Sequence, residues 1–257
     1  MRPLEILLVL AICAAVFAPW LPWHRLRKAL RPLPLVLLIA AGGQIMIEGA
    51  RWQMAPAYGL ALAVILIPLL RGPRAERRSR AGLGLGLVAL VVAITPPLAF
   101  PVFQLPEPDG PYAIGTVTYD WVDTGRPEAF TAAPDDRREL MVQVWYPARP
   151  NPAARRAPYL ADGMVLAPLA RLLHMPDFVF QHLKYIRTNA MPGAPLTAGG
   201  RFPLLIFSHG RGGFRQHNSL EIESLVSHGY VVAAIDHTYA GAGVDSPTAA
   251  APRWTNG

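Results

Sequence analysis

The sequence is poor in cysteine and in charge. Cys13 is the one cysteine among 257 residues, and it lies within an apolar run. A single cysteine excludes an intrachain disulfide and a cysteine-based metal cluster, so we expect Cys13 to be a small buried hydrophobic residue. Charged residues make up 16% of the chain and hydrophobic residues 52%, which is an apolar composition for a soluble protein.

The positive charge is confined to the first part of the chain. Residues 1–104 contain eleven Lys or Arg and three acidic residues, whereas residues 105–257 contain thirteen basic and fourteen acidic residues. The formal net charge of +7 therefore comes from residues 1–104, where the basic residues are interleaved with long apolar runs. This pattern excludes a nucleic-acid partner as the reason for the high pI. It divides the chain into a membrane region, 1–104, and an outer domain, 105–257.

Four apolar runs predict four membrane-spanning helices, with the lipid bilayer as their partner. They cover about residues 3–20, 33–47, 55–70 and 82–103. Each approaches the roughly 20 residues that cross a bilayer as a helix, although the second and third need flanking residues. Helices of a soluble core are the alternative, but the runs fill almost all of the first 104 residues. The "GLGLG" stretch at 82–86 opens the last run and indicates close helix packing.

The loops between these runs predict the orientation. Loop 21–32 carries four Lys or Arg and loop 71–81 carries five, whereas loop 48–54 carries one. The positive-inside rule places the two basic loops in the cytoplasm, so the N-terminus and residues 105–257 lie outside. A cleaved signal peptide is the alternative for the first run. Glu5 and Glu48 lie at the ends of runs, so we expect no ionisable cluster inside the membrane region.

The outer domain alternates strand-like and helical segments. Strands are predicted at 114–123, 139–146, 204–207 and 230–235, helical segments at 163–173 and 176–187, and a polar turn at 134–138. Asn218 and Glu221 have the spacing of a capping box, and Gly229 ends the helix that Asn218 begins. Two strands followed by strand–helix–strand indicate an α/β sheet with an antiparallel start. The tail 242–257 is expected to be irregular.

Several segments together carry a family pattern: "LMVQVWYPA" (140–148), "APLTAGGRFPLLIFSHGRGG" (194–213), "SHGYVVAAIDH" (227–237) and "EGARWQMAPAY" (48–58). Residues 112–241 resemble the N-terminal half of an α/β-hydrolase of the platelet-activating factor acetylhydrolase type, and 48–58 is similar to membrane-anchored bacterial relatives. The resemblance implies a truncated hydrolase-type sheet and a bacterial inner or plasma membrane location. It also implies a serine carboxylic ester hydrolase acting on an ester or acetylated phospholipid, with no cofactor and no metal.

The resemblance gives a role to the turn after the strand 204–207. In α/β-hydrolases this turn supplies one backbone N–H of the oxyanion hole. By position the donor is Arg211, supported by His209, Gly210, Gly212 and Gly213. A tight strand-to-helix turn without a ligand is the alternative. Arg211 departs from the family pattern, in which an apolar residue is usual at this position.

The family's catalytic triad is missing from the sequence. No G-x-S-x-G motif is present, and all seven histidines precede the point where that motif would stand, whereas the family order is serine, acid, histidine. We therefore expect no catalytic residue here, and a chain that ends before its nucleophile and is inactive alone. Ser208 is expected to be a buried hydroxyl facing away from His209, and Asp236 to be structural. The strand 204–207 is expected to lie between 230–235 and an absent strand.

A membrane scaffold or interaction protein with a vestigial hydrolase segment is the alternative function. The sequence does not indicate an oligomeric state, an acyl chain or a head group.

Overall fold

The computed structural model describes residues 1–21, 29–30, 32–71, 80–129, 133, 135–160, 165–210 and 212–237. The chain forms two compact units, Met1–Phe103 and Gln104–Gly257, which we name the helical unit and the sheet unit. Three predicted features lie outside the described residues: the oxyanion donor Arg211, the tail 242–257 and most of the two basic loops.

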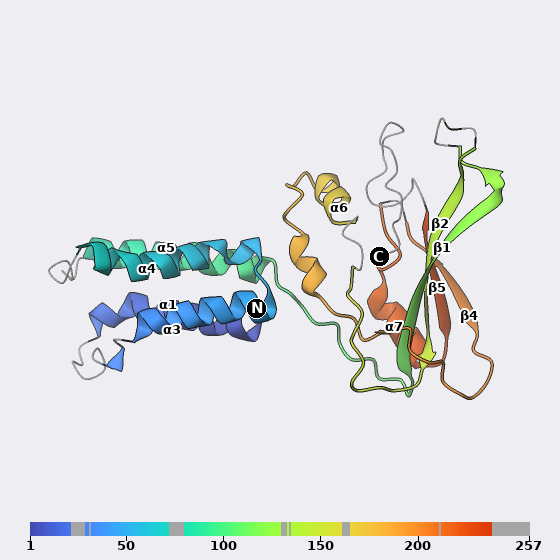
Figure 1. Ribbon diagram of the computed structural model, residues 1–257, viewed down its shortest axis with the longest axis horizontal. Helices are drawn as coiled ribbons and strands as arrows, with labels where there is room; N and C mark the ends of the chain where they lie inside the picture. The colour runs from blue at the N-terminus through green and yellow to red at the C-terminus, as the bar shows by residue number, and fades with distance from the viewer. Residues whose placement is uncertain are drawn as a thin grey trace. The chain divides into compact units, whose positions relative to one another are not determined.

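The helical unit consists of apolar helices that lie side by side (Figure 1). Its elements are α1 (Pro3–Phe17), η1 (Ala18–Trp20), α3 (Leu33–Gly43), η2 (Gln44–Glu48), η3 (Trp52–Met54), α4 (Ala55–Arg71) and α5 (Arg80–Ala99). Proline occupies the first position of α1, where its missing N–H leaves no intrahelical hydrogen bond unmade. Pro96 and Pro97 lie near the C-terminal end of α5.

Within the described residues, three helical segments are long and apolar enough to cross a membrane, namely Pro3–Trp20, Trp52–Leu70 and Ala81–Ala99. The predicted run 33–47 is also helical, but its apolar helix, Leu33–Glu48, is shorter. It consists of α3 and the wider π-helical turn η2. The four apolar runs are therefore helical over most of their length, and a bilayer crossing by all four stays a prediction.

Small residues let the helices of this unit approach one another. A Cβ atom added to Gly86 of α5 would lie 3.0 Å from Val16 Cγ1 of α1, so close helix packing is present at Gly86, whereas Gly84 has open space around its Cα. The core beside it includes the fully buried residues Leu8, Leu37, Met54, Ala57 and Ala93. Cys13 packs against this core but is only partly buried, whereas the sequence predicted a buried side chain.

A buried cluster of charged residues lies at the start of α1, and the sequence did not predict it. Glu5 accepts hydrogen bonds from Nε and Nη2 of Arg51 at 2.7 and 2.8 Å, and both side chains are at most 1% exposed. Arg2 Nη2 lies 2.8 Å from Glu5 Oε1, and Arg2 Nε lies 3.7 Å from Glu48 Oε2. Arg51 also donates to the carbonyl oxygen of Phe100. The cluster therefore joins α1, the α3–α4 connection and the end of α5.

The sheet unit contains a mixed sheet (Figure 1). Its described strands are β1 (Ala113–Pro127), β2 (Arg137–Ala148), β3 (Met191–Pro192), β4 (Leu204–Ser208) and β5 (Val231–His237), in the order β3-β1-β2-β5-β4. β1–β2 and β2–β5 are antiparallel, and β4–β5 is parallel. The antiparallel start predicted from the sequence is thus present. β3, which pairs parallel with β1, was not predicted, and Arg137 and Arg138 belong to β2 and not to the preceding turn.

β4 lies at the edge of the sheet formed by the described residues, with β5 as its neighbour. Leu204, Leu205 and Ile206 are 60%, 37% and 70% exposed. A strand with apolar side chains on both faces is typical of the interior of a parallel sheet. No described strand pairs with the other side of β4, so among the described residues this edge is open.

Helix α7 (Ser219–Ser227) covers one face of the sheet. Ile222 and Val226 of α7 share a buried core with Trp145 of β2 and with Val232 and Ala234 of β5. The burial pattern along β5 alternates because every second side chain points toward this helix.

The two ends of α7 differ in how well the sequence predicted them. Asn218 is the N-cap residue, but its side chain makes no capping hydrogen bond, so the predicted capping box is wrong. The C-terminal end is confirmed, because Gly229 adopts a φ of +93°. The N–H of Gly229 bonds to the carbonyl of Val226 at 3.0 Å and that of Tyr230 to the carbonyl of Leu225 at 3.2 Å, which is a Schellman motif.

The segment between β2 and β3 contains less helix than predicted. Its described helical elements are α6 (Leu166–Leu172) and a 3-10 helix, η6 (Gln181–Tyr185). Leu160, Val165 and Leu166 form a second core cluster with Phe214, which lies just after the glycine-rich turn that ends β4. This contact fastens the segment to the region where the candidate site lies.

Candidate active site

The carboxyl ends of β4 and β5 bring Ser208 and His237 together. The two strands run parallel with Ser208 opposite Ile235. Ser208 Oγ lies 2.7 Å from His237 Nε2, although 29 positions separate the residues. Ser208 is exposed and His237 is partly buried, so the predicted burial of Ser208 is wrong. The carboxyl ends of neighbouring parallel strands are where ligands of open α/β sheets bind.

The environment of His237 favours its neutral form. Burial lowers the pKa of His237 below its ordinary value, and the nearby His209 and Arg138 lower it further. Asp236 raises this pKa, but by less than the other groups lower it. A neutral imidazole has one nitrogen that accepts a hydrogen bond. The Ser208 hydroxyl can therefore donate to His237 Nε2 at neutral pH.

His209 comes directly after Ser208 in the sequence but is buried, as expected for consecutive residues on opposite sides of a strand. Its Nδ1 lies 2.9 Å from the carbonyl oxygen of Gly210, which only accepts, so Nδ1 carries a proton. Its Nε2 faces the backbone N–H of His237 at 3.5 Å, and the two rings meet edge to face with centroids 5.4 Å apart. His209 thus links the glycine-rich turn to the end of β5.

Asp236 is held by a buried arginine. The backbone N–H of Arg215 donates to Asp236 Oδ1 at 2.6 Å, and the guanidinium Nη1 pairs with Oδ2. Arg215 is 1% exposed, and its Nε also donates to Oε1 of Gln143 at 3.3 Å. The carboxylate lies 3.6 Å from Nε2 of His209. This pair fastens the chain after the glycine-rich turn to the end of β5, so Asp236 has the structural role expected of it.

Two of the glycines in the turn are required by the backbone. Gly212 has a φ of +73°, where other residues are strained. A Cβ atom on Gly213 would lie 3.0 Å from the Gly210 carbonyl oxygen and from His209 Cβ, and the Gly213 N–H bonds to that carbonyl at 2.9 Å. Gly210 has open space around its Cα. The turn is therefore tight, and the role of the Arg211 N–H as oxyanion donor stays a prediction.

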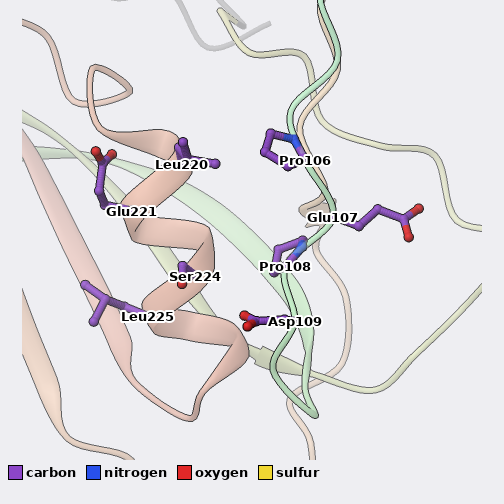
Figure 2. Close-up of a pocket in the computed structure, with 8 residues that line it drawn as sticks. All are labelled: Pro106, Glu107, Pro108, Asp109, Leu220, Glu221, Ser224 and Leu225. Atoms are coloured by element: carbon purple, nitrogen blue, oxygen red, sulfur yellow. The ribbon is translucent and has the colours of Figure 1, made fainter.

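A separate groove of about 530 Å³ lies between the segment 106–109 and α7 (Figure 2). Its lining residues are Pro106, Glu107, Pro108, Asp109, Leu220, Glu221, Ser224 and Leu225. Asn189 fixes one wall, because its Nδ2 donates to the Pro106 carbonyl and to Glu223 Oε2, both at 2.9 Å. Burial raises the pKa of Glu223 above its ordinary value despite the hydrogen bonds from Asn189. Neither Ser208 nor His237 lines the groove.

No group of three or more His, Cys, Asp or Glu residues is placed to hold a metal ion in the part of the chain that the structure describes. Among the described residues at the carboxyl edge, only Ser208 combines an exposed hydroxyl with a hydrogen bond to an imidazole. This pair was not predicted from the sequence, in which His209, the immediate neighbour of Ser208, is the more obvious partner. The signal was present, since Ser208 and His237 each end a strand of one strand–helix–strand unit.

A parallel strand pair that ends in a glycine-rich turn, within a sheet with an antiparallel start, defines the class as an α/β-hydrolase-type domain. The profile of the family described as platelet-activating factor acetylhydrolase, isoform II, matches residues 98–248, more than half of the chain. The chain belongs to this family.

Individual relatives agree with the family profile. The chain is 29% identical over 138 residues to a platelet-activating factor acetylhydrolase of Cavia porcellus, a match that covers 52% of this chain and 28% of the relative. It is 26% identical over 140 residues to that of Canis lupus familiaris, with the same coverage of 52% and 28%. The matched part thus spans less than a third of these relatives' own length.

One solved structure also resembles the chain. It is a ferulic acid esterase from Streptomyces cinnamoneus, 34% identical, with a TM-score of 0.43. The likeness covers 55% of this chain and 38% of the esterase.

Proposed function

We propose that the protein is a membrane-anchored carboxylic ester hydrolase whose substrate is an acetylated phospholipid or a related ester. The observation that carries this proposal is the match of the platelet-activating factor acetylhydrolase family to residues 98–248. The turn after β4 supports it, because that turn stands where the family's fold provides the oxyanion hole. Family membership favours this function over a membrane scaffold with a vestigial segment.

The site would act through the backbone of the glycine-rich turn. A donor at Arg211, next to the glycines at 212 and 213, would stabilise the oxyanion that develops on the substrate carbonyl. One such preorganised donor contributes about 3 kcal/mol to catalysis. Gly212 and Gly213 support this role, since their backbone geometry accepts no side chain without strain or a close contact.

The nucleophile of the family is not among the 257 residues, since none of them forms a G-x-S-x-G motif. We therefore propose that these residues supply the oxyanion side of the site and do not hydrolyse acetylated phospholipids alone. The charge of the predicted loops supports an orientation with the sheet unit on the extracytoplasmic side. The resemblance of residues 48–58 to membrane-anchored bacterial relatives supports a bacterial inner or plasma membrane location.

The test extends the chain with the coding sequence that lies downstream in its gene. The DNA after codon 257 is read in all frames, and residues 1–257 are expressed in nanodiscs alone and joined to each continuation. A G-x-S-x-G motif with Asp and His codons after it, and acetate release from an acetylated phospholipid only by the joined protein, would support the proposal. The absence of such a motif from every frame would overturn it.

A further inference from the structure

We propose that Ser208 is a reactive serine: His237 activates its hydroxyl to accept an acyl or phosphonyl group from small activated esters and fluorophosphonates. This reactivity goes beyond the proposed function, because it uses neither a G-x-S-x-G serine nor the family's triad histidine.

The geometry is that of a nucleophile and its base. The 2.7 Å between Ser208 Oγ and His237 Nε2 lies within the roughly 2.6–3.2 Å over which a histidine can take a serine proton. Ser208 is exposed on the last position of β4, so a small electrophile can reach Oγ.

Other serines of the sheet unit provide a contrast. Ser227 Oγ lies 3.4 Å from His228 Nδ1, but Ser227 is fully buried and its hydroxyl donates to the Ser224 carbonyl at 2.7 Å. The hydroxyl of Ser219 likewise donates to the Gln216 carbonyl at 2.8 Å. A hydroxyl proton directed at a carbonyl oxygen is not transferred to a base, so neither serine is activated.

The charged groups around His237 keep the ring available as a base. His209 and Asp236 adjoin it at the end of β5, and Arg138 approaches from β2. Arg138 is itself paired with Glu128, with Nη1 3.2 Å from Oε2. Asp236 is paired with Arg215 and raises the pKa of His237, but by less than burial, His209 and Arg138 lower it.

The chemical step uses this geometry directly. With a fluorophosphonate, Ser208 Oγ forms a bond to phosphorus as the P–F bond breaks and fluoride leaves. The hydroxyl proton moves to His237 Nε2 and from there to water. With an aryl ester, Oγ bonds to the acyl carbon and the aryloxide leaves. Water later attacks the acyl carbon, with His237 as base; the bond from Oγ to the acyl carbon breaks, the carboxylic acid leaves and the Ser208 hydroxyl is restored.

The reaction should be slow. In serine proteases, loss of the carboxylate that orients the histidine lowers the rate by about 10⁴-fold, and here Asp236 pairs with Arg215. An irreversible phosphonylation accumulates even at a low rate. Ester turnover at the same rate stays close to spontaneous hydrolysis, so slow labelling is compatible with a chain that is inactive in ester assays.

The experiment uses the full chain in nanodiscs and a fluorescent fluorophosphonate, with the adduct located by peptide mass spectrometry. We expect one adduct, on Ser208, that is lost on denaturation before labelling. Ser208→Ala should abolish it, and His237→Gln should slow labelling by at least about tenfold, as loss of a general base does. The matched control Ser224→Ala, on α7, should label like the unchanged chain. An absent adduct, an adduct on another serine, or an unchanged rate in His237→Gln would overturn the proposal.

A second variant covers the case in which Ser208→Ala fails to fold. Ser208→Cys should be alkylated by iodoacetamide faster than the double variant Ser208→Cys, His237→Gln, since the imidazole favours the thiolate. Equal rates in the two variants would contradict the proposal. Failure here is distinguishable from failure of the proposed function, because acetate release by the joined protein depends on its G-x-S-x-G serine and not on Ser208.

Discussion

Glu5 and Arg51 form a buried ion pair, with Oε1 of Glu5 2.7 Å from Nε of Arg51, across 46 positions of the chain. Both side chains are withdrawn from solvent, and Arg51 also binds the carbonyl oxygen of Phe100 after α5. Removal of one partner from such a pair leaves a buried charge without compensation. The pair is therefore a determinant of how the helices of this unit associate.

Glu5→Gln should destabilise the helical unit by about 3–5 kcal/mol, because Arg51 would keep a buried charge without its carboxylate. Thermal unfolding of the full chain in nanodiscs measures the effect. The loss of stability in the double variant Glu5→Gln, Arg51→Gln should be smaller than the sum of the losses in the two single variants. Thr95→Ala, an exposed change on α5, is the matched control. Additive losses would contradict a direct pairing.

The orientation of the chain is tested by reporter fusions. The four and five positive charges of loops 21–32 and 71–81 predict that both loops are cytoplasmic. A reporter fused after Glu76 should behave as cytoplasmic, and one fused after Gly110 as extracytoplasmic. The reverse pattern would exclude this topology.

Residues 1–257 alone should release no acetate from acetylated phospholipids above background, and should not turn over short p-nitrophenyl esters above background. The physical reason is that no G-x-S-x-G serine is present, and loss of the nucleophile removes most of the rate enhancement of a serine hydrolase. Steady-state assays of the chain in nanodiscs check this. Clear turnover that a serine-directed phosphonate abolishes would require a competent nucleophile within the chain.

The open edge of β4 should make residues 105–257 aggregate or become protease-sensitive when they are expressed without the helical unit. Unpaired N–H and C=O groups beside exposed apolar side chains favour pairing with other chains. Ile206→Lys, at a position that is 70% exposed on β4, should reduce aggregation in light scattering. Leu220→Lys, at a position that is 49% exposed on α7, removes a similar side chain from another surface and should change little. A soluble monomer with one cooperative unfolding transition would contradict the prediction.

The labelling of Ser208 should depend on the protonation of His237. Because burial, His209 and Arg138 lower the pKa of His237, labelling should persist at neutral pH and fall only as the pH drops below about 6.5. A protonated imidazole cannot accept the serine proton. Rates measured between about pH 5 and 8 give the profile. Arg138→Gln should move the fall to higher pH, whereas Arg201→Gln, an exposed control, should not.

Local patterns in the sequence were sufficient for most elements. The strand-like runs at 114–123, 139–146, 204–207 and 230–235 all became strands, because side-chain alternation and β-branched residues act locally. Gly229 ended its helix as predicted, since only its own positive φ is needed. The capping box at Asn218 failed although its residue types were correct, because their spacing does not determine whether the side-chain hydrogen bond forms.

The sequence by itself determined the apolar runs, the glycine-rich turn and the absence of a G-x-S-x-G motif. Only the tertiary structure decided which distant side chains meet. Glu5 reaches Arg51 because helices associate side by side, and Ser208 reaches His237 because two parallel strands end at the same edge of a sheet. Such contacts depend on the register of whole elements, so residue spacing in the sequence does not reveal them.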